Sequence, residues 1–228
     1  MHELSKYIDH TILKPTATNA DIEQLCKEAI EHKFKAVCVP PYYVSMVSEL
    51  LENTDVKVAT VIGFPMGYAP IAAKVEEAKR MIADGAYELD VVVNLAAVKN
   101  ERWNYVQNEL DIMTTTCHLQ DRKIKIIFET GLLSDAEIKR LCEISKMIGA
   151  DFVKTSTGIN GGGATVEAVK LMRENLPAQI GIKASGGIRT KEDAEAMIAA
   201  GATRIGTSAG ISITSLNPNA IKLRMQQK

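Results

Sequence analysis

Short apolar runs alternate with amphipathic stretches from one end of the chain to the other. Several runs, such as residues 58–62, 91–93 and 124–128, are almost continuously apolar, as expected for parallel strands that are covered on both faces. The pattern predicts eight strands: Tyr7–Leu13, Ala36–Pro40, Lys57–Gly63, Glu88–Asn94, Lys123–Glu129, Asp151–Ser156, Gln179–Ala184 and Thr203–Ser208. Their starts are about 28 residues apart on average, which is close to the length of one β/α unit.

The stretches between these runs have the spacing of amphipathic helices, with one face that can cover a sheet. Two such faces are formed by Ile22, Leu25, Cys26, Ala29 and Ile30, and by Ile138, Leu141, Cys142, Ser145 and Ile148. Three helix starts are indicated by capping patterns, at Ser134 with Glu137, Thr190 with Asp193, and Asn217 before Pro218. Three helix ends are indicated by glycine, at Gly85, Gly149 and Gly201.

Eight β/α units without a composition break or a linker indicate one domain. We expect residues 1–228 to form a single (β/α)8 barrel, the TIM-barrel fold of the α/β class. An open, doubly wound parallel sheet is the alternative. Such a sheet more often has five or six strands, and no G-x-G-x-x-G follows the first predicted strand.

Composition and charge narrow the class of protein. The 228 residues are 46% hydrophobic and 24% charged, which argues against a disordered or fibrous chain. Lys and Arg number 27 against 28 Asp and Glu, so a nucleic-acid-binding excess of positive charge is absent and an anionic substrate needs a local site. No apolar run reaches the roughly 18 residues that span a membrane. The four cysteines form no C-x-x-C pair, which predicts reduced thiols. No apolar signal segment is visible, so we expect a cytoplasmic location.

Barrels of this kind carry their active sites at the C-terminal ends of the strands. The polar residues that lie late in predicted strands are Asp9, Asp90, Asn94, Lys154 and Lys183. Three other lysines fall at strand starts, so we expect them on the opposite face or in solvent: Lys57, Lys123 and Lys125.

Lys154 and Lys183 interrupt apolar strands, where burial disfavours the charged form of an amine. Each lysine is either half of an ion pair, a side chain that reaches the rim, or a catalytic amine. Two ammonium groups that face one cavity repel each other, which lowers the pKa of at least one, and Schiff-base formation requires a neutral amine. Asp9 and Asp90 need cationic partners if buried, which the lysines supply; alternatively, each carboxylate fixes a neighbouring backbone.

Glycine-rich loops follow the last three predicted strands. Gly186-Gly187 follows the seventh strand and Ser208-Ala209-Gly210 the eighth, where barrels often bind phosphate through backbone N–H groups. Thr157-Gly158 and glycines 161–163, after the sixth strand, add further donors. Glycine also serves ordinary turns, so the prediction of a phosphate site rests on the two loops occurring together.

Other conspicuous residues have simpler interpretations. His10 and His118 have no second histidine or acid at metal-ligand spacing, so no metal site is predicted. Cys38 is either a small buried hydrophobic residue or a thiol near a reactive aldehyde. Trp103 begins a helical packing face, which continues through Val106, Leu110 and Met113.

Five motifs together resemble the deoxyribose-phosphate aldolase family, over about residues 5–212. They are Tyr7–Pro15 (YIDHTILKP), Val61–Pro65 (VIGFP), Phe152–Gly158 (FVKTSTG), Lys183–Arg189 (KASGGIR) and Arg204–Ser208 (RIGTS). The resemblance implies a class I aldolase on a TIM barrel. Such an enzyme reversibly cleaves 2-deoxy-D-ribose 5-phosphate to D-glyceraldehyde 3-phosphate and acetaldehyde, in deoxyribonucleoside catabolism.

The resemblance also implies roles for individual residues. Lys154 would form the Schiff base, Lys183 would lower its pKa, Asp90 would transfer protons, and Asp9 would belong to the same polar network. The phosphate end would be lined by Thr157, Gly158, Gly186, Gly187 and Ser208. No metal or other cofactor is implied. The expected partners are the small phosphorylated sugar, acetaldehyde and a second copy in a homodimer, with no nucleic acid and no membrane.

Three rival functions fit the same residues. Another Schiff-base aldolase, or a transaldolase, would act on a different phosphorylated sugar, which substrate assays would reveal. A sugar-phosphate isomerase or epimerase would use the lysines only to bind charge, and borohydride would then trap no imine. A sugar-phosphate sensor would show no turnover at all.

Overall fold

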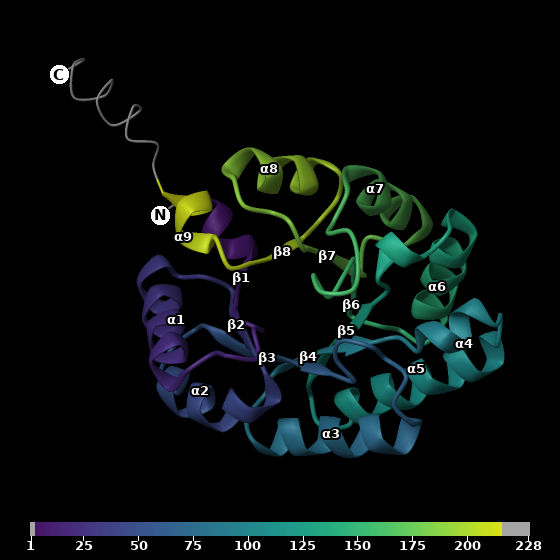
Figure 1. Cartoon of the computed structure of the whole chain (residues 1–228), viewed down its shortest axis with the longest axis horizontal. Coiled ribbons are helices and arrows are strands. Elements are labelled where there is room, and N and C mark those ends of the chain that lie inside the picture. The colour runs from purple at the N-terminus through teal and green to yellow at the C-terminus, as the bar shows by residue number, and fades with distance from the viewer. Residues whose placement is uncertain (1–2, 216–228) are drawn as a thin grey trace.

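The eight predicted strands close into one parallel barrel in the computed structural model, which describes residues 3–215. Each strand pairs with the next in sequence, and β8 pairs with β1 to close the barrel (Figure 1). The strands are β1 (Ile8–Thr11), β2 (Ala36–Val39), β3 (Lys57–Ile62), β4 (Glu88–Val92), β5 (Lys123–Ile127), β6 (Phe152–Lys154), β7 (Gly181–Ser185) and β8 (Arg204–Thr207). The chain therefore adopts the (β/α)8 barrel, and the open-sheet alternative is wrong.

The helices form an outer ring around this barrel (Figure 1). They are α1 (Asn19–His32), α2 (Val44–Leu51), α3 (Ile71–Ala83), α4 (Leu95–Lys99), α5 (Trp103–His118), α6 (Asp135–Met147), α7 (Val166–Asn175), α8 (Lys191–Ala199) and α9 (Gly210–Thr214). Short 3-10 turns lie at Glu3–Tyr7, Pro41–Tyr43 and Thr130–Leu132. No helix within residues 3–215 is long and apolar enough to cross a membrane. The expected helix start at Asn217 lies outside the described residues.

Local sequence signals set the helix boundaries. Ser134 caps α6 and Thr190 caps α8, each in a reciprocal capping box as predicted, and Thr18 with Asp21 forms a third at α1. The glycines predicted at helix ends have positive φ. The strands are shorter than predicted, because the chain leaves the sheet before Asn94, Glu129 and Ser156. These residues therefore lie in the loops at the C-terminal end of the barrel.

Two different kinds of packing occur on the two sides of the strands. The outward side chains, such as Val37, Val91 and Ile126, form one large apolar core with the helices. Inside the barrel, a small apolar cluster on β2 and β3 is formed by Ala36, Cys38, Ala59 and Val61. The rest of the interior holds buried charges from β1, β4, β5, β6, β7 and β8. Bulky branched side chains usually fill such an interior, so buried charges in this place indicate a functional site.

Candidate active site

A cavity opens at the C-terminal end of the barrel, between the ends of β1, β6, β7 and β8. Its volume is about 390 Å³, which is within the range of small-molecule sites. The charged side chains that line it are all cations: Lys14, Lys154, Lys183 and Arg189. Although the whole chain carries a net charge of −1, this cavity therefore suits an anionic ligand.

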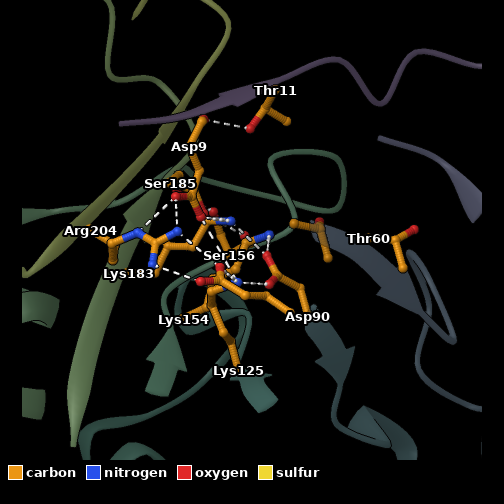
Figure 2. A network of polar contacts seen from close by, with 12 residues as sticks. Asp9, Thr11, Thr60, Asp90, Lys125, Lys154, Ser156, Lys183, Ser185 and Arg204 are labelled. Atoms are coloured by element: carbon orange, nitrogen blue, oxygen red, sulfur yellow. Dashed lines mark hydrogen bonds and ion pairs between the residues drawn. The ribbon is translucent and has the colours of Figure 1, made fainter. Parts of the chain in front are cut away.

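Lys154 and Lys183 converge on one carboxylate, as Figure 2 shows. They are register partners on β6 and β7, so both side chains project from the same level of the barrel. Each Nζ lies 2.8 Å from Oδ2 of Asp90 on β4. All three side chains are at most 2% exposed. The structure thus brings the three predicted catalytic residues together.

Asp9 joins this cluster from β1. Its Oδ2 lies 2.7 Å from Nζ of Lys183, and its Oδ1 accepts a 2.7 Å hydrogen bond from Nε of Arg204 on β8. The guanidinium of Arg204 also donates to both carboxylate oxygens of Glu88, at 3.0 and 2.9 Å. Asp9 therefore contacts the two-lysine centre directly and links it to a second ion pair.

The prediction for Lys125 is wrong. Its side chain is fully buried inside the barrel, with Nζ 2.7 Å from Oδ1 of Asp90 and 2.6 Å from Oε2 of Glu88. Lys125 is in register with Asp90, and only Lys123, two residues nearer the strand start, reaches solvent to pair with Asp151. The two carboxylates stabilise the buried ammonium. Because Glu88 and Asp90 are far from residue 125 in the sequence, no local pattern reveals this contact.

The electrostatics make the two predicted catalytic lysines unequal. Burial lowers the pKa of Lys154, and the charge of Lys183 lowers it further, although the Asp90 carboxylate opposes both effects. Burial acts in the same direction on Lys183, but the carboxylates of Asp9 and Asp90 outweigh it and raise the pKa of that lysine. Lys154 is therefore the easier of the two to deprotonate, whereas Lys183 stays charged.

The acids of the cluster stay ionised. Burial by itself would raise the pKa of Asp90, but Lys125, Lys154 and Lys183 lower it well below its ordinary value. The pKa of Asp9 is lowered in the same way, chiefly by Arg204 and Lys183 against the effect of burial. In the enzyme without substrate these carboxylates are therefore ionised, and they position the lysines.

The predicted phosphate residues meet at the outer end of the cavity. Gly158, Gly186, Gly187 and Ser208 all line it, and within residues 3–215 their backbone N–H groups donate to no protein acceptor. Gly186 has φ +90°, and a Cβ there would lie 2.7 Å from Oγ of Ser156 and 2.8 Å from Cα of Gly163, so only glycine fits. Unpaired backbone N–H groups that gather around one cavity are donors of the kind that bind anions in other proteins.

Thr157 also lines the cavity, but its polar groups face away from a ligand. Its N–H donates to Oε1 of Glu129 at 3.1 Å, and its hydroxyl donates to Oε2 of the same carboxylate. Thr157 therefore shapes the loop and is not free to bind phosphate directly. Glu129 was not among the predicted residues, although an acid directly after the apolar run 124–128 satisfies the rule that selected Asp90.

The remaining candidates take structural positions. Cys38 is fully buried inside the barrel, and burial raises the pKa of its thiol. Nε2 of His10 lies 2.8 Å from Glu28, and Nε2 of His118 lies 2.9 Å from Asp151. Among residues 3–215, no group of three or more His, Cys, Asp or Glu side chains is arranged to hold a metal ion. The Asn94 side chain caps α4 by accepting from the N–H of Ala97.

Known proteins resemble this chain over nearly its whole length. The family model for DeoC/LacD family aldolases matches residues 4–215. The deoxyribose-phosphate aldolase of Thermococcus kodakarensis is 52% identical over 219 residues, which are 95% of this chain and 98% of that protein. The deoxyribose-phosphate aldolase of Clostridium novyi is 51% identical over 210 residues, 92% of this chain and 94% of the relative.

Solved structures agree with these relatives. An aldolase structure that is 42% identical superposes with a TM-score of 0.90 and covers 100% of both chains. The deoxyribose phosphate aldolase of Aeropyrum pernix, described as a tetramer, has a TM-score of 0.87 and 35% identity, and the match covers 96% of this chain and 91% of that one.

Proposed function

Because the chain belongs to the DeoC/LacD family of aldolases, we propose that it reversibly cleaves 2-deoxy-D-ribose 5-phosphate to D-glyceraldehyde 3-phosphate and acetaldehyde. The reaction proceeds through a Schiff base on Lys154. The observation that carries this proposal is the pair of buried lysines on one carboxylate, of which Lys154 has the lowered pKa. A neutral, cavity-facing amine beside a permanent positive charge is the arrangement that carbonyl attack requires.

The balance of charge inside the barrel supports Lys154 as the neutral amine. Four cations lie there, Lys125, Lys154, Lys183 and Arg204, together with three carboxylates, Asp9, Glu88 and Asp90. Buried charge is costly unless it is compensated. When Lys154 loses its proton, the remaining three cations balance the three carboxylates. The neutral form of this lysine is thus favoured by the overall charge of the cluster, although Asp90 by itself opposes it.

The reaction follows from this arrangement. Nζ of Lys154 attacks the C1 aldehyde of the open-chain sugar to give a carbinolamine, which takes up one proton and loses water to leave an iminium ion. A base takes the proton of the C3 hydroxyl, the C2–C3 bond breaks, and its electron pair moves onto the iminium to give a neutral enamine. Glyceraldehyde 3-phosphate leaves, and the enamine takes a proton at C2 to become an iminium ion again. Water then adds and releases acetaldehyde, the neutral amine of Lys154 and one proton.

Asp90 and the neighbouring charges assist particular steps. Oδ2 of Asp90 is within hydrogen-bond distance of both lysines, so it is placed to move protons at the carbinolamine stage. Cleavage converts a cationic iminium into a neutral enamine, and this restores the charge balance of the barrel interior. The cluster therefore favours the step that breaks the C–C bond.

The outer end of the cavity binds the 5-phosphate. The unpaired N–H groups of Gly158, Gly186, Gly187 and Ser208 surround one end of the same cavity, and the side chains of Lys14 and Arg189 also line it. Backbone N–H groups bind phosphate well in loops of this kind. Lys154 and these donors line one cavity, so the aldehyde and phosphate ends of a single sugar can be held together.

The proposal includes no metal ion, because the iminium supplies the electron sink that a Lewis acid would otherwise provide. Activity that EDTA abolishes and zinc restores would contradict it. The homodimer, the cytoplasmic location and the place in deoxyribonucleoside catabolism remain predictions. Light scattering decides between a dimer and the tetramer described for the relative from Aeropyrum pernix.

A cleavage assay with separate detection of both products tests the proposed function. Purified enzyme should release glyceraldehyde 3-phosphate and acetaldehyde in equal amounts from deoxyribose 5-phosphate, and Lys154→Arg should abolish this, because an arginine does not form the imine. The control is Lys74→Met, which removes another fully buried lysine, on α3. Cleavage by Lys154→Arg at the wild-type rate, or turnover confined to a different sugar phosphate, would overturn the proposal.

A further inference from the structure

A buried acid behind the phosphate end of the cavity is not used by the reaction. Glu129 follows β5 and has no exposed surface. Its backbone is left-handed, with φ 62° and ψ 56°, which is unusual for a residue other than glycine. A strained and fully buried carboxylate needs strong compensating contacts to persist.

Those contacts all come from uncharged donors of one loop, which follows β6. Oε1 of Glu129 accepts from the N–H of Thr157 at 3.1 Å, and Oε2 accepts the Thr157 hydroxyl and the side-chain amide of Asn160, the latter at 3.4 Å. The hydroxyl oxygen of Thr157 in turn accepts from the N–H of Ile159 at 3.0 Å. Glu129 therefore organises the start of this loop at several points.

The same loop is fixed to two further strand ends. The Asn160 amide donates to the carbonyl of Pro65, after β3, at 2.6 Å. The N–H of Ala164 donates to the carbonyl of Gly186, after β7, at 3.0 Å. Gly158 lies next to the clamped Thr157, and Gly186 accepts from the end of the loop. The loop that Glu129 holds at its start thus connects two of the unpaired N–H donors at the outer end of the cavity.

We propose that Glu129 is a positioning residue for phosphate selectivity: by holding Thr157 it sets the direction of the Gly158 N–H and the spacing between Gly158 and Gly186. This inference rests on the proposed function, because the phosphate is that of the sugar substrate. Glu129 does not line the cavity, so it acts through the loop and does not contact the substrate. Thr157, whose N–H and hydroxyl are both bound to Glu129, transmits the effect.

The test compares the variants Glu129→Gln and Glu109→Gln. Both remove the charge of a buried glutamate that accepts a backbone N–H, but Glu109 lies on α5 and accepts from the N–H of Asn94. The readout is kcat/KM for deoxyribose 5-phosphate divided by kcat/KM for unphosphorylated deoxyribose. Glu129→Gln should lower this ratio at least about tenfold, which is the effect of losing one charge-assisted hydrogen bond. The change should come mainly from a higher KM for the phosphorylated sugar. Glu109→Gln should leave the ratio unchanged.

Two further measurements keep the inference separate from folding and from the proposed function. If Glu129→Gln does not fold, the pair Thr157→Val and Thr157→Ser replaces it; Ser keeps the hydroxyl and should lose less selectivity than Val. Equal loss on both sugars, or the same ratio as wild type, overturns the role of Glu129 while cleavage by the wild-type enzyme still supports the proposed function. If the wild-type enzyme cleaves neither sugar, the proposed function fails first and this inference fails with it.

Discussion

Replacing Lys183 by methionine tests the proposal that the charge of Lys183 helps to keep Lys154 neutral. Methionine has a similar length and no charge, so it removes the ammonium group that lies 2.7 Å from Asp9 and 2.8 Å from Asp90. With that charge gone, the Asp90 carboxylate acts on Lys154 with less competition. The loss of the repulsion from Lys183 and the stronger attraction by Asp90 both favour the protonated form of Lys154, so the pKa of Lys154 should rise.

The size of the shift follows from the geometry. Both lysine nitrogens lie 2.8 Å from the same oxygen of Asp90, so they are less than about 6 Å apart. Two unit charges about 5 Å apart repel by about 3 kcal/mol at an effective dielectric constant of about 20. Since one pKa unit corresponds to about 1.4 kcal/mol, the pKa of Lys154 should rise by about two in the variant.

The assay is the pH profile of kcat/KM for cleavage, whose acid limb reports the free enzyme. Because the neutral amine is the reactive form, a higher pKa moves the acid limb to higher pH, by about two pH units. Lys74→Met serves as the control and should leave the limb in place, since Lys74 pairs with Glu109 outside the cavity. An acid limb that stays in place or moves to lower pH in Lys183→Met would refute the electrostatic role of Lys183.

Three further predictions concern the buried groups. Asp9, Glu88 and Asp90 have lowered pKa values in the folded state. The stability that they contribute above about pH 4 is therefore lost as the pH falls further, and equal free energies of unfolding in urea at about pH 5 and about pH 2 would contradict this. Gly206→Ala would place a Cβ 2.8 Å from Cβ of Ser185 and 2.9 Å from Cε of Lys183, so it should lower kcat by about 100-fold in a folded protein, and a wild-type kcat would be evidence against it. Burial raises the pKa of Cys26 to about 11 and of Cys117 and Cys142 to about 12, so native protein at about pH 8 should react slowly with a thiol reagent and quickly in urea; equal rates would show that these thiols are accessible.

The barrel could be predicted from the sequence because its signals are local. Runs such as residues 58–62 indicate buried parallel strands, and Ser134 with Glu137 marks a helix start that the structure confirms. Lys154 and Lys183 were found in the same way, since a lysine late in an apolar strand is conspicuous in a single segment. Once the barrel is assumed, the end of each strand points to one common site.

The partners of those residues could not be predicted from local patterns. Arg204 binds Asp9 across 195 positions of sequence and Glu88 across 116, and no periodicity connects them. The position of Lys125 near a strand start predicts solvent exposure, and only its contacts with Glu88 and Asp90, far away in the sequence, show that it is buried inside the barrel. Thr157 lines the cavity, but only the structure shows that its N–H and hydroxyl donate to Glu129.

Borohydride trapping followed by peptide mapping shows whether Lys154 forms the imine. Wild-type enzyme is treated with acetaldehyde and borohydride, digested, and analysed by mass spectrometry. We expect an ethyl group on the peptide that carries Lys154, and none on those that carry Lys125 or Lys183, because these two have raised pKa values. An ethyl group on Lys183 or Lys125 with Lys154 unmodified, or no modification at any of the three, would contradict it.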